Sequence, residues 1–210
     1  MKPLILVGGG GHCKSVIEAA ESAGYTILGV LDMPENVGKR ILSAEIIGTD
    51  DDIPLYVDKA YFVITVGFIK SPAIRIRLYD KIKAAGGNLA TIIASTAYVS
   101  RYATIGEGTV VMHNAFVNAG AKVGNNVILN TFVNIEHDAV IGDQCHISTG
   151  TMVNGECKVG NNVFVGSQSV LANCIDIADD IIVGAGSLVR KSLRVKGIYS
   201  GNPAILKIKL

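Results

Sequence analysis

The sequence carries almost no net charge. Its 210 residues include 19 lysines and arginines against 18 aspartates and glutamates, and no basic run occurs. Proteins that bind nucleic acids or anionic membranes through their charge usually present a basic patch. Neither of these partners is therefore expected, and chemistry on a small molecule is the favoured class of function.

Cysteines and long apolar runs are also scarce. The four cysteines, Cys13, Cys145, Cys157 and Cys174, show no CxxC spacing, and we expect reduced core thiols. The apolar run at residues 3–7 is too short for a signal peptide or a membrane span. The protein is therefore expected to be cytoplasmic.

The most regular feature of the sequence is a hexapeptide repeat. Isoleucine, leucine or valine occurs at every sixth position from Ile93 to Val189, and a small residue follows four positions later in most hexads. The aliphatic positions are Ile93, Val99, Ile105, Val111, Val117, Val123, Leu129, Ile135, Ile141, Ile147, Val153, Val159, Val165, Leu171, Ile177, Val183 and Val189.

A period of six fits neither a helix nor simple strand alternation, so each hexad is expected to form one short strand and one corner. If three hexads complete one turn, the coils stack as a triangular prism with the aliphatic and small residues inside. Glycine or asparagine directly follows the aliphatic residue in nine hexads, as at Gly106 and Asn118, and we interpret these positions as corners with positive φ. The repeat thus predicts a parallel β-helix.

Ahead of the repeat, the sequence predicts a βαβ unit. A strand over residues 4–7 ends in the glycines Gly8 to Gly11, and a helical stripe over residues 12–23 follows. A second strand over residues 25–31 ends at Asp32, an acidic residue at the carboxyl end of a buried strand. A ligand-binding crevice is expected there.

The rest of this region predicts a small α/β sheet. We expect strands near residues 45–47 and 61–66, and a helix that begins at Ser71-Pro72 and ends at Gly86. Residues 1–90 should form a Rossmann-like domain with this ligand-binding crevice. Residues 91–210 should form the β-helix domain with a C-terminal tail, joined rigidly to the first domain.

Three segments together resemble one family. They are the glycine-rich turn with His12, the motif Ile-Glu-His137-Asp138 within the hexads, and Gly-Asn-Pro-Ala at residues 201–204. Over nearly its whole length, the chain resembles the bacterial sugar O-/N-acyltransferases of the sialic-acid O-acetyltransferase type. These include the UDP-4-amino-sugar N-acetyltransferases of bacillosamine and perosamine synthesis. The resemblance implies a left-handed β-helix, a homotrimer, and transfer of acetyl from acetyl-CoA to the amino group of a nucleotide-activated amino sugar in glycan biosynthesis.

The resemblance also implies roles for particular residues. His137 is the expected general base and Asp138 the acid that raises its basicity, with Glu136 as the alternative partner. The residues expected to contact acetyl-CoA are His146, Ser167 and Ala185. Those expected to bind the acceptor are Gly10, Gly11, His12, Asp32, Met33 and Gly67.

The histidines of the β-helix suggest a metal site as an alternative to a catalytic base. His137 lies outside the inward slots of its hexad and should face outward or into a subunit interface, and His113 and His146 also lie outside these slots. Ligands from one chain would stack at spacings near eighteen or thirty-six residues, whereas these histidines are 24 and 9 apart. No metal is therefore expected.

Other functions stay open at this point. Sialic acid or another sugar hydroxyl is an alternative acceptor, which would make the protein an O-acetyltransferase. The 24 residues from Gly8 to Asp32 also approach the spacing of a dinucleotide site, which would suit an NAD-dependent oxidoreductase. A non-catalytic trimeric scaffold is a further alternative. The outward apolar residues expected to need cover in a trimer are Val111, Phe116, Phe132, Val133 and Met152.

Overall fold

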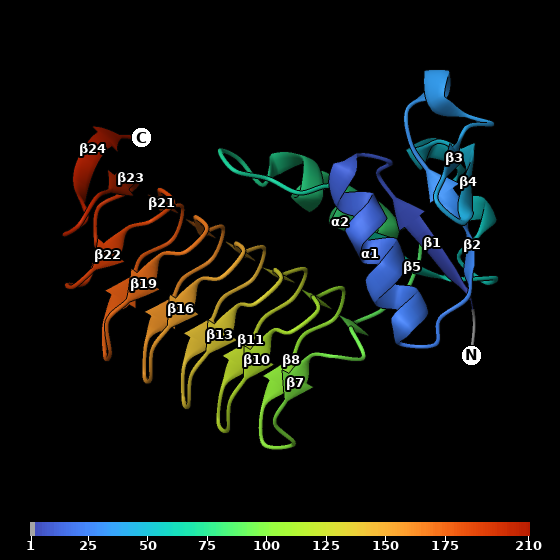
Figure 1. Cartoon of the computed structure of the whole chain (residues 1–210). Coiled ribbons are helices and arrows are strands. Elements are labelled where there is room, and N and C mark those ends of the chain that lie inside the picture. The colour runs from blue at the N-terminus through green and yellow to red at the C-terminus, as the bar shows by residue number, and fades with distance from the viewer. Residues whose placement is uncertain (1–2) are drawn as a thin grey trace.

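The computed structural model describes residues 3–210, which form an α/β unit followed by a long β-helix (Figure 1). The α/β unit holds a five-stranded sheet in the order β3-β4-β2-β1-β5. Its strands are β1 (Leu4–Val7), β2 (Ile27–Leu31), β3 (Arg40–Ile41), β4 (Ala44–Gly48) and β5 (Tyr61–Ile64). Because β1 pairs in parallel with both β2 and β5, the carboxyl ends of these three strands meet at one edge.

Helices lie beside this sheet and between it and the β-helix. They are α1 (Gly11–Ser22) and α2 (Ala73–Ala84), and two 3-10 segments, η1 (Pro34–Asn36) and η2 (Asp50–Leu55), follow β2 and β4. The predicted βαβ unit and the helix after the third buried strand are therefore confirmed. The segment expected to be loops around one short strand also contains β3, which forms a hairpin with β4.

The hexads form a stack of two-residue strands. They are β6 (Ile92–Ile93), β7 (Tyr98–Val99), β8 (Thr104–Ile105), β9 (Val110–Val111), β10 (Phe116–Val117), β11 (Lys122–Val123), β12 (Ile128–Leu129), β13 (Asn134–Ile135), β14 (Val140–Ile141), β15 (His146–Ile147), β16 (Met152–Val153), β17 (Lys158–Val159), β18 (Phe164–Val165), β19 (Val170–Leu171), β20 (Asp176–Ile177), β21 (Ile182–Val183) and β22 (Leu188–Val189).

Each strand pairs in parallel with the strand three places further along the chain. Phe116 lies beside Asn134, and Asn134 beside Met152, a register of eighteen residues or three hexads. The second residue of each pair points inward and, from the second coil onward, is buried in one continuous apolar core. The predicted fold class, an α/β unit followed by a left-handed parallel β-helix, is confirmed.

The conformation of the corners differs from the prediction. Positive φ occurs three residues after the inward aliphatic residue, as at Asn126 and Asp138, and not at the glycine directly after it. That glycine is needed for a different reason. A Cβ on Gly106 would lie 2.5 Å from the carbonyl of Gly124 in the next coil, so only glycine allows the coils to stack this closely.

The three faces of the prism differ in what their outward side chains meet. We call them the covered face, the apolar face and the polar face. The covered face carries Val110, Ile128, His146, Phe164 and Ile182 and is buried. The apolar face carries Tyr98, Phe116, Asn134, Met152, Val170 and Leu188, and the polar face carries Thr104, Lys122, Val140, Lys158 and Asp176, which are partly or fully exposed.

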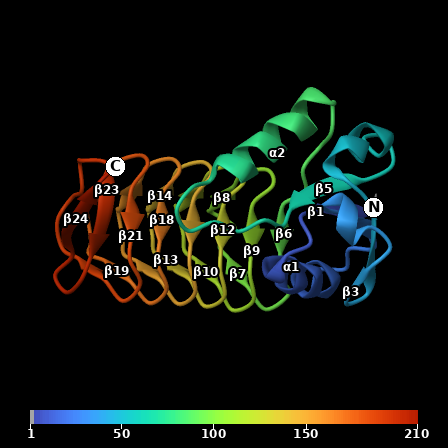
Figure 2. The ribbon, with the colours of Figure 1, turned by 90° about the horizontal axis from the view of Figure 1, so that it is seen from above.

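The α/β unit and the β5–α2 connection lie against the covered face (Figure 2). Helix α1 packs on β6, and one apolar cluster includes Leu4 and Val16 of the α/β unit together with Val110 and Met112 of the first coils. The two parts are therefore joined by a shared core, as the missing linker predicted. The domain division at residue 90 stays a prediction.

Two candidates for outward apolar residues were wrong. Val111 and Val133 are buried inside the prism, because they occupy the aliphatic and the small slot of their hexads. Phe116, Phe132 and Met152 do lie outward and are exposed.

The chain ends in a hairpin at the far end of the β-helix. Strand β23 (Gly197–Ser200) continues the covered face beyond β21, and β24 (Ile205–Lys209) pairs with it in antiparallel fashion. The predicted tail is thus a short terminal cap. Within residues 3–210, no helix combines the length and the apolarity that crossing a membrane requires.

Candidate active site

The glycine turn after β1 has the shape expected for binding an extended ligand. Gly8 has φ of +109°, and a Cβ there would lie 2.3 Å from the side chain of Val66, so no other residue fits. Gly10 is the N-cap of α1 and Gly11 its first residue. A Cβ on either of them would meet nothing within 4 Å, so the turn is open toward the start of the helix. Free N–H groups at a helix start suit a phosphate.

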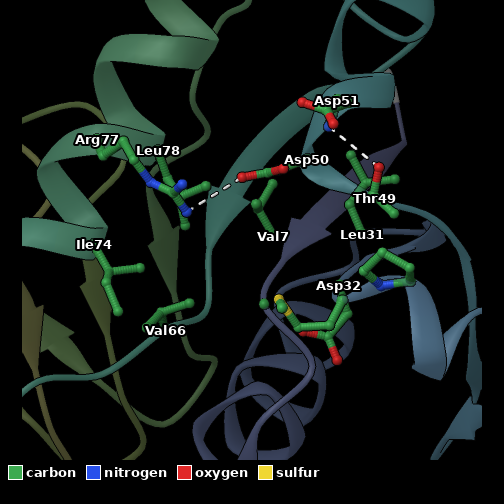
Figure 3. A pocket seen from close by; sticks show the side chains of 13 residues that line it. Val7, Leu31, Asp32, Thr49, Asp50, Asp51, Val66, Ile74, Arg77 and Leu78 are labelled. Carbon is green, nitrogen blue, oxygen red and sulfur yellow. Dashed lines mark hydrogen bonds and ion pairs between the residues drawn. The ribbon is translucent and has the colours of Figure 1, made fainter.

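A cavity of about 340 Å³ opens at the carboxyl ends of the parallel strands (Figure 3). Asp32 and Met33, two of the residues expected to bind the acceptor, line it. The Asp32 carboxylate accepts a hydrogen bond of 2.8 Å from Asn36 Nδ2, which fixes its orientation.

One wall of this cavity was missed by the sequence reasoning. It comes from η2 and from the first turns of α2, and an ion pair of 3.3 Å joins Arg77 to Asp50 across it. The helix was predicted, but no pattern in the sequence indicated which of its faces lies over β1 and β5. The residues missed are Thr49, Asp50, Asp51, Ile74, Arg77 and Leu78.

His12 lies at the junction between the α/β unit and the β-helix. Its ring centroid is 6.4 Å from that of His146, and a Cβ on Gly67 would be 3.9 Å from its Cβ. Burial, with smaller contributions from Arg75 and His146, lowers the pKa of His12 to about 3, so the ring is neutral. The structure thus brings His12 and Gly67 to the edge of the sheet that also carries the glycine turn and Asp32.

His146 faces the α/β unit from the covered face. Its Nδ1 lies 2.7 Å from the backbone oxygen of Phe68, so Nδ1 carries the proton and donates it to that carbonyl. Burial lowers the pKa of His146 to about 4. At neutral pH, Nε2 is therefore an acceptor, and Asn130 Nδ2 lies 3.4 Å from it. The ring of Phe164 lies beside the imidazole at a centroid distance of 5.2 Å.

Ser167 and Ala185 stack at the corner between the covered and the apolar face, which we call the serine corner. Ser167 Oγ is 2.9 Å from Ser148 Oγ one coil earlier, and its carbonyl accepts from the N–H of Gly186 at 2.8 Å. Ser167 is half-buried and Ala185 exposed. This corner therefore presents backbone groups and hydroxyls to the outside.

His137 and Asp138 form the corner between the apolar and the polar face, the histidine corner. Asp138 has φ of +59°, which turns its side chain back so that Oδ2 lies 3.0 Å from His137 Nδ1. Glu136, the alternative partner, instead accepts from Asn118 at 2.7 Å and Asn134 at 3.0 Å. The structure therefore pairs His137 with Asp138.

The imidazole of His137 is accessible and basic. Its side chain is 53% exposed, and the Asp138 hydrogen bond, followed by the nearby acidic charges, raises its pKa. The ring lies over Gly155 of the next coil, where a Cβ would be 2.6 Å from Nε2. A neutral imidazole whose Nδ1–H is held by a carboxylate presents an unprotonated Nε2, the arrangement of a general base.

Among the thiols of residues 3–210, Cys174 is the one that lies open at the histidine corner, where it lines a hollow together with Asp138 and Glu156. Cys13, Cys145 and Cys157 are buried, as expected, and burial raises the pKa of Cys145 to about 12. Cys174 is exposed, so the expectation of a core thiol was wrong there. It occupies the positive-φ position of its hexad, which points outward.

The described residues also offer no metal-binding cluster. Over residues 3–210, no three histidine, cysteine or acidic side chains converge in a way that could hold an ion. His113 lies on the serine corner three coils before Ser167, with Nδ1 at 2.8 Å from Thr96 Oγ1.

One chain does not bring all the predicted site residues together. In each coil, a strand of the apolar face separates the serine corner from the histidine corner. His146 and the acceptor-site residues lie on the covered side of the molecule, whereas His137 lies across the apolar face from them. The candidate site therefore divides into an acceptor crevice with His146, a serine corner and a histidine corner.

Comparison with known proteins gives the same two-part architecture. Residues 3–82 match the PglD N-terminal domain, and residues 120–155 match the bacterial transferase hexapeptide repeats. The fold of the whole chain is similar to perosamine N-acetyltransferase (PerB) from Caulobacter crescentus in complex with CoA and GDP-perosamine. The identity is 28%, the TM-score is 0.91, and the match covers 99% of this chain and 98% of that chain.

A second similar structure is the acetyltransferase domain of PglB from Neisseria gonorrhoeae in complex with acetyl coenzyme A. The identity is 26% and the TM-score 0.90, with 98% of this chain and 99% of that chain covered. WeeI from Acinetobacter baumannii, at 19% identity and a TM-score of 0.84, shares the fold. The chain thus combines a PglD-type N-terminal domain with bacterial transferase hexapeptide repeats, and its predicted resemblance to the sugar acyltransferases of this type is confirmed.

Proposed function

We propose that this protein is an acetyltransferase that moves an acetyl group from acetyl-CoA to the amino group of a nucleotide-activated amino sugar. The observation that carries the proposal is the histidine corner, where an accessible imidazole is oriented by Asp138 at 3.0 Å. Similarity over the whole chain to PerB, a perosamine N-acetyltransferase bound to CoA and GDP-perosamine, supports the choice of donor and acceptor.

The reaction proceeds by direct transfer. The amine nitrogen of the sugar attacks the thioester carbonyl carbon, and His137 Nε2 takes the proton that the nitrogen loses. The tetrahedral intermediate collapses with cleavage of the C–S bond. The imidazolium then returns the proton to the departing thiolate, which leaves free CoA and the N-acetylated sugar. Asp138 stabilises the imidazolium between these two proton transfers.

We assign the acceptor to residues 1–90 and the acetyl-transferring surface to residues 91–210. Gly10, Gly11 and His12 lie where the diphosphate would meet the start of α1. Asp32 and Met33 line the cavity, which is large enough for a nucleoside. Gly67, next to His12, lies on the path from this cavity toward His146.

The donor is held outside the prism at the serine corner. His146, Ser167 and Ala185 are the residues that we assign to acetyl-CoA. The exposed backbone at Ser167 and Ala185 suits the amide groups of the pantetheine arm, and the neutral Nε2 of His146 accepts a hydrogen bond near the thioester end.

The active protein is a homotrimer whose site lies between chains. The apolar face is the face left uncovered, and Tyr98 and Phe116 stack on it at 4.8 Å. A threefold ring joins two different patches, so the histidine corner of one chain meets the serine corner of the next. This contact brings together the groups that a single chain keeps apart.

The experiment is mass spectrometry of products after incubation with acetyl-CoA and a panel of nucleotide-linked amino sugars and sialic acids. We expect a mass increase of one acetyl group on an amino sugar nucleotide. If only a hydroxyl is acetylated, the acceptor is an alcohol and not an amine. If no member of the panel is acetylated, the proposed function is wrong.

Replacing the base tests the mechanism in the same assay. His137→Ala should lower kcat by about 10²–10⁴-fold, because a general base typically contributes that much, while the KM values for both substrates change little. Cys174→Ala tests the exposed thiol that lines the same hollow as Asp138, and direct transfer predicts that its kcat stays at the wild-type level. A labelled acetyl group trapped on a cysteine would contradict direct transfer.

A further inference from the structure

Arg75 on α2 is buried without a counter-ion. Arg75 is 1% exposed, and none of the ion pairs formed by the described residues includes it. Burial lowers the pKa of its guanidinium to about 9, so the group keeps its charge at neutral pH. A buried charge is costly unless its hydrogen bonds are made, and an apolar side chain could fill the same space. Packing alone therefore does not explain why an arginine stands at position 75.

The guanidinium joins the α/β unit to the β-helix. On one side, Nη1 donates to the carbonyls of Ile64 at 3.1 Å and Val66 at 2.7 Å, at the end of β5. On the other side, Nη2 donates to the carbonyl of Asn126 at 2.9 Å and to Asn126 Oδ1. The planar fork of arginine allows both sets of bonds at once, which the ammonium of lysine does not.

Both ends of this bridge lie directly behind groups assigned to the reaction. Val66 packs against Gly8 of the glycine turn, and Gly67 lies beside His12. Asn126 forms a β-helix corner, and its Nδ2 donates at 2.6 Å to Gln144, two residues before His146. The bridge thus connects the acceptor crevice to the coil that carries His146.

We propose that Arg75 is a positioning residue that fixes the acceptor crevice relative to the acetyl-transferring coils through its four hydrogen bonds to β5 and Asn126. This inference rests on the proposed function for its effect on turnover. The sugar amine must reach the thioester carbon within a few tenths of an ångström, and a misplacement of about 1 Å can cost about 10²-fold in rate. Arg75 therefore affects the step in which both substrates are bound together.

The test separates turnover from binding. Arg75→Lys keeps the positive charge but cannot make both sets of bonds, so kcat should fall by about 10–100-fold. The dissociation constants of acetyl-CoA and of the amino-sugar nucleotide, measured separately by calorimetry, should change by less than about 3-fold, because none of the hydrogen bonds of Arg75 goes to a residue that we assign to either ligand. A folded Arg75→Lys variant with wild-type kcat would overturn the proposal.

A second variant covers the case in which Arg75→Lys does not fold. Asn126→Gly removes the side-chain acceptor but keeps the left-handed corner, since Asn126 has φ of +51°. Its matched control is Asn162→Gly, at a corner with φ of +60° whose side chain also donates to the next coil. We expect a lower kcat for Asn126→Gly than for Asn162→Gly, and equal values would overturn the proposal.

Hydrogen exchange provides a readout that does not depend on acetyl transfer. In Asn126→Gly and Arg75→Lys, amides of residues 64–68 and 126–130 should exchange faster than in the wild type, while those of β19 and β22 stay unchanged. If the wild type transfers no acetyl group, the proposed function fails, and the exchange data still decide whether Arg75 couples the two parts. Unchanged exchange in both segments would contradict the coupling.

Discussion

The chemistry of His137 depends on its two immediate neighbours in space. Asp138 holds Nδ1 at 3.0 Å, and Gly155 leaves room for the ring over the next coil. Neither neighbour contributes a reacting atom. Each nevertheless determines where Nε2 points and how readily it accepts a proton.

The Asp138 carboxylate sets the basicity of His137. Asp138 raises the pKa of His137, so Asp138→Asn should lower that pKa. The base works only when neutral, and its neutral fraction falls as the pH drops through the pKa. Removing the carboxylate should therefore move the acidic limb of the kcat profile to lower pH, with a smaller loss of kcat at the plateau than His137→Ala gives. An acidic limb that stays in place would show that His137 does not set it.

Gly155 gives the His137 ring room over the next coil. Its φ is not in the left-handed region, so Gly155→Ala is allowed by the backbone, but the new Cβ would lie 2.6 Å from His137 Nε2. The ring should rotate away from Asp138, lowering kcat by about 10-fold or more while the melting temperature changes little. Thr104→Ala, at an exposed residue of the polar face outside the hollow that Asp138 lines, is the suitable control. Wild-type kcat in Gly155→Ala would contradict the geometry of the histidine corner.

Among single residues, the partner of His137 illustrates what the sequence could and could not predict. The motif gave His137, but Glu136 and Asp138 flank it symmetrically in the chain. Which of the two carboxylates pairs with His137 depends on the positive φ at Asp138 and on the two asparagines that donate hydrogen bonds to Glu136. The first feature belongs to the backbone of the corner, and the Asn118 bond depends on the stacking of coils eighteen residues apart.

At the scale of elements, each short β-helix strand is stabilised by the coils above and below it. Leu129 of β12 is fully buried between neighbouring coils. Leu129→Ala should therefore lower the free energy of unfolding by about 2–5 kcal/mol, measured by urea denaturation. Leu28→Ala, the same substitution at a residue that is 44% exposed, should change it by less than about 1 kcal/mol. Similar losses at both positions would mean that the prism interior is not the stabilising core.

The elements themselves were predictable where a pattern repeats. Six-residue periodicity predicted the strands, the register and the inward residues of the β-helix. The prediction that Val111 and Val133 face outward was wrong because it ignored their positions in the hexads, which are the inward aliphatic slot and the inward small slot. The cavity wall from Asp50 to Arg77 was not predictable, because it depends on how α2 packs over β1 and β5, and no local motif encodes that packing.

At the scale of the whole molecule, the three faces of the prism have different partners. The α/β unit covers one face, charged and polar side chains keep the second in contact with solvent, and the aromatic and aliphatic residues of the apolar face remain uncovered. Placing the acceptor crevice and the base on different sides of one chain makes sense if neighbouring chains complete the site.

Mixing two inactive variants tests this account most directly. His137→Ala removes the histidine corner and leaves the serine corner intact, whereas Ala185→Trp fills the serine corner and leaves His137 intact. Co-expressed in equal amounts, they should recover about a quarter of wild-type acetyl transfer, because one in four contacts between neighbours in a threefold ring pairs the two intact corners. If the mixture is no more active than the two variants measured separately, the site lies within one chain and the account is wrong.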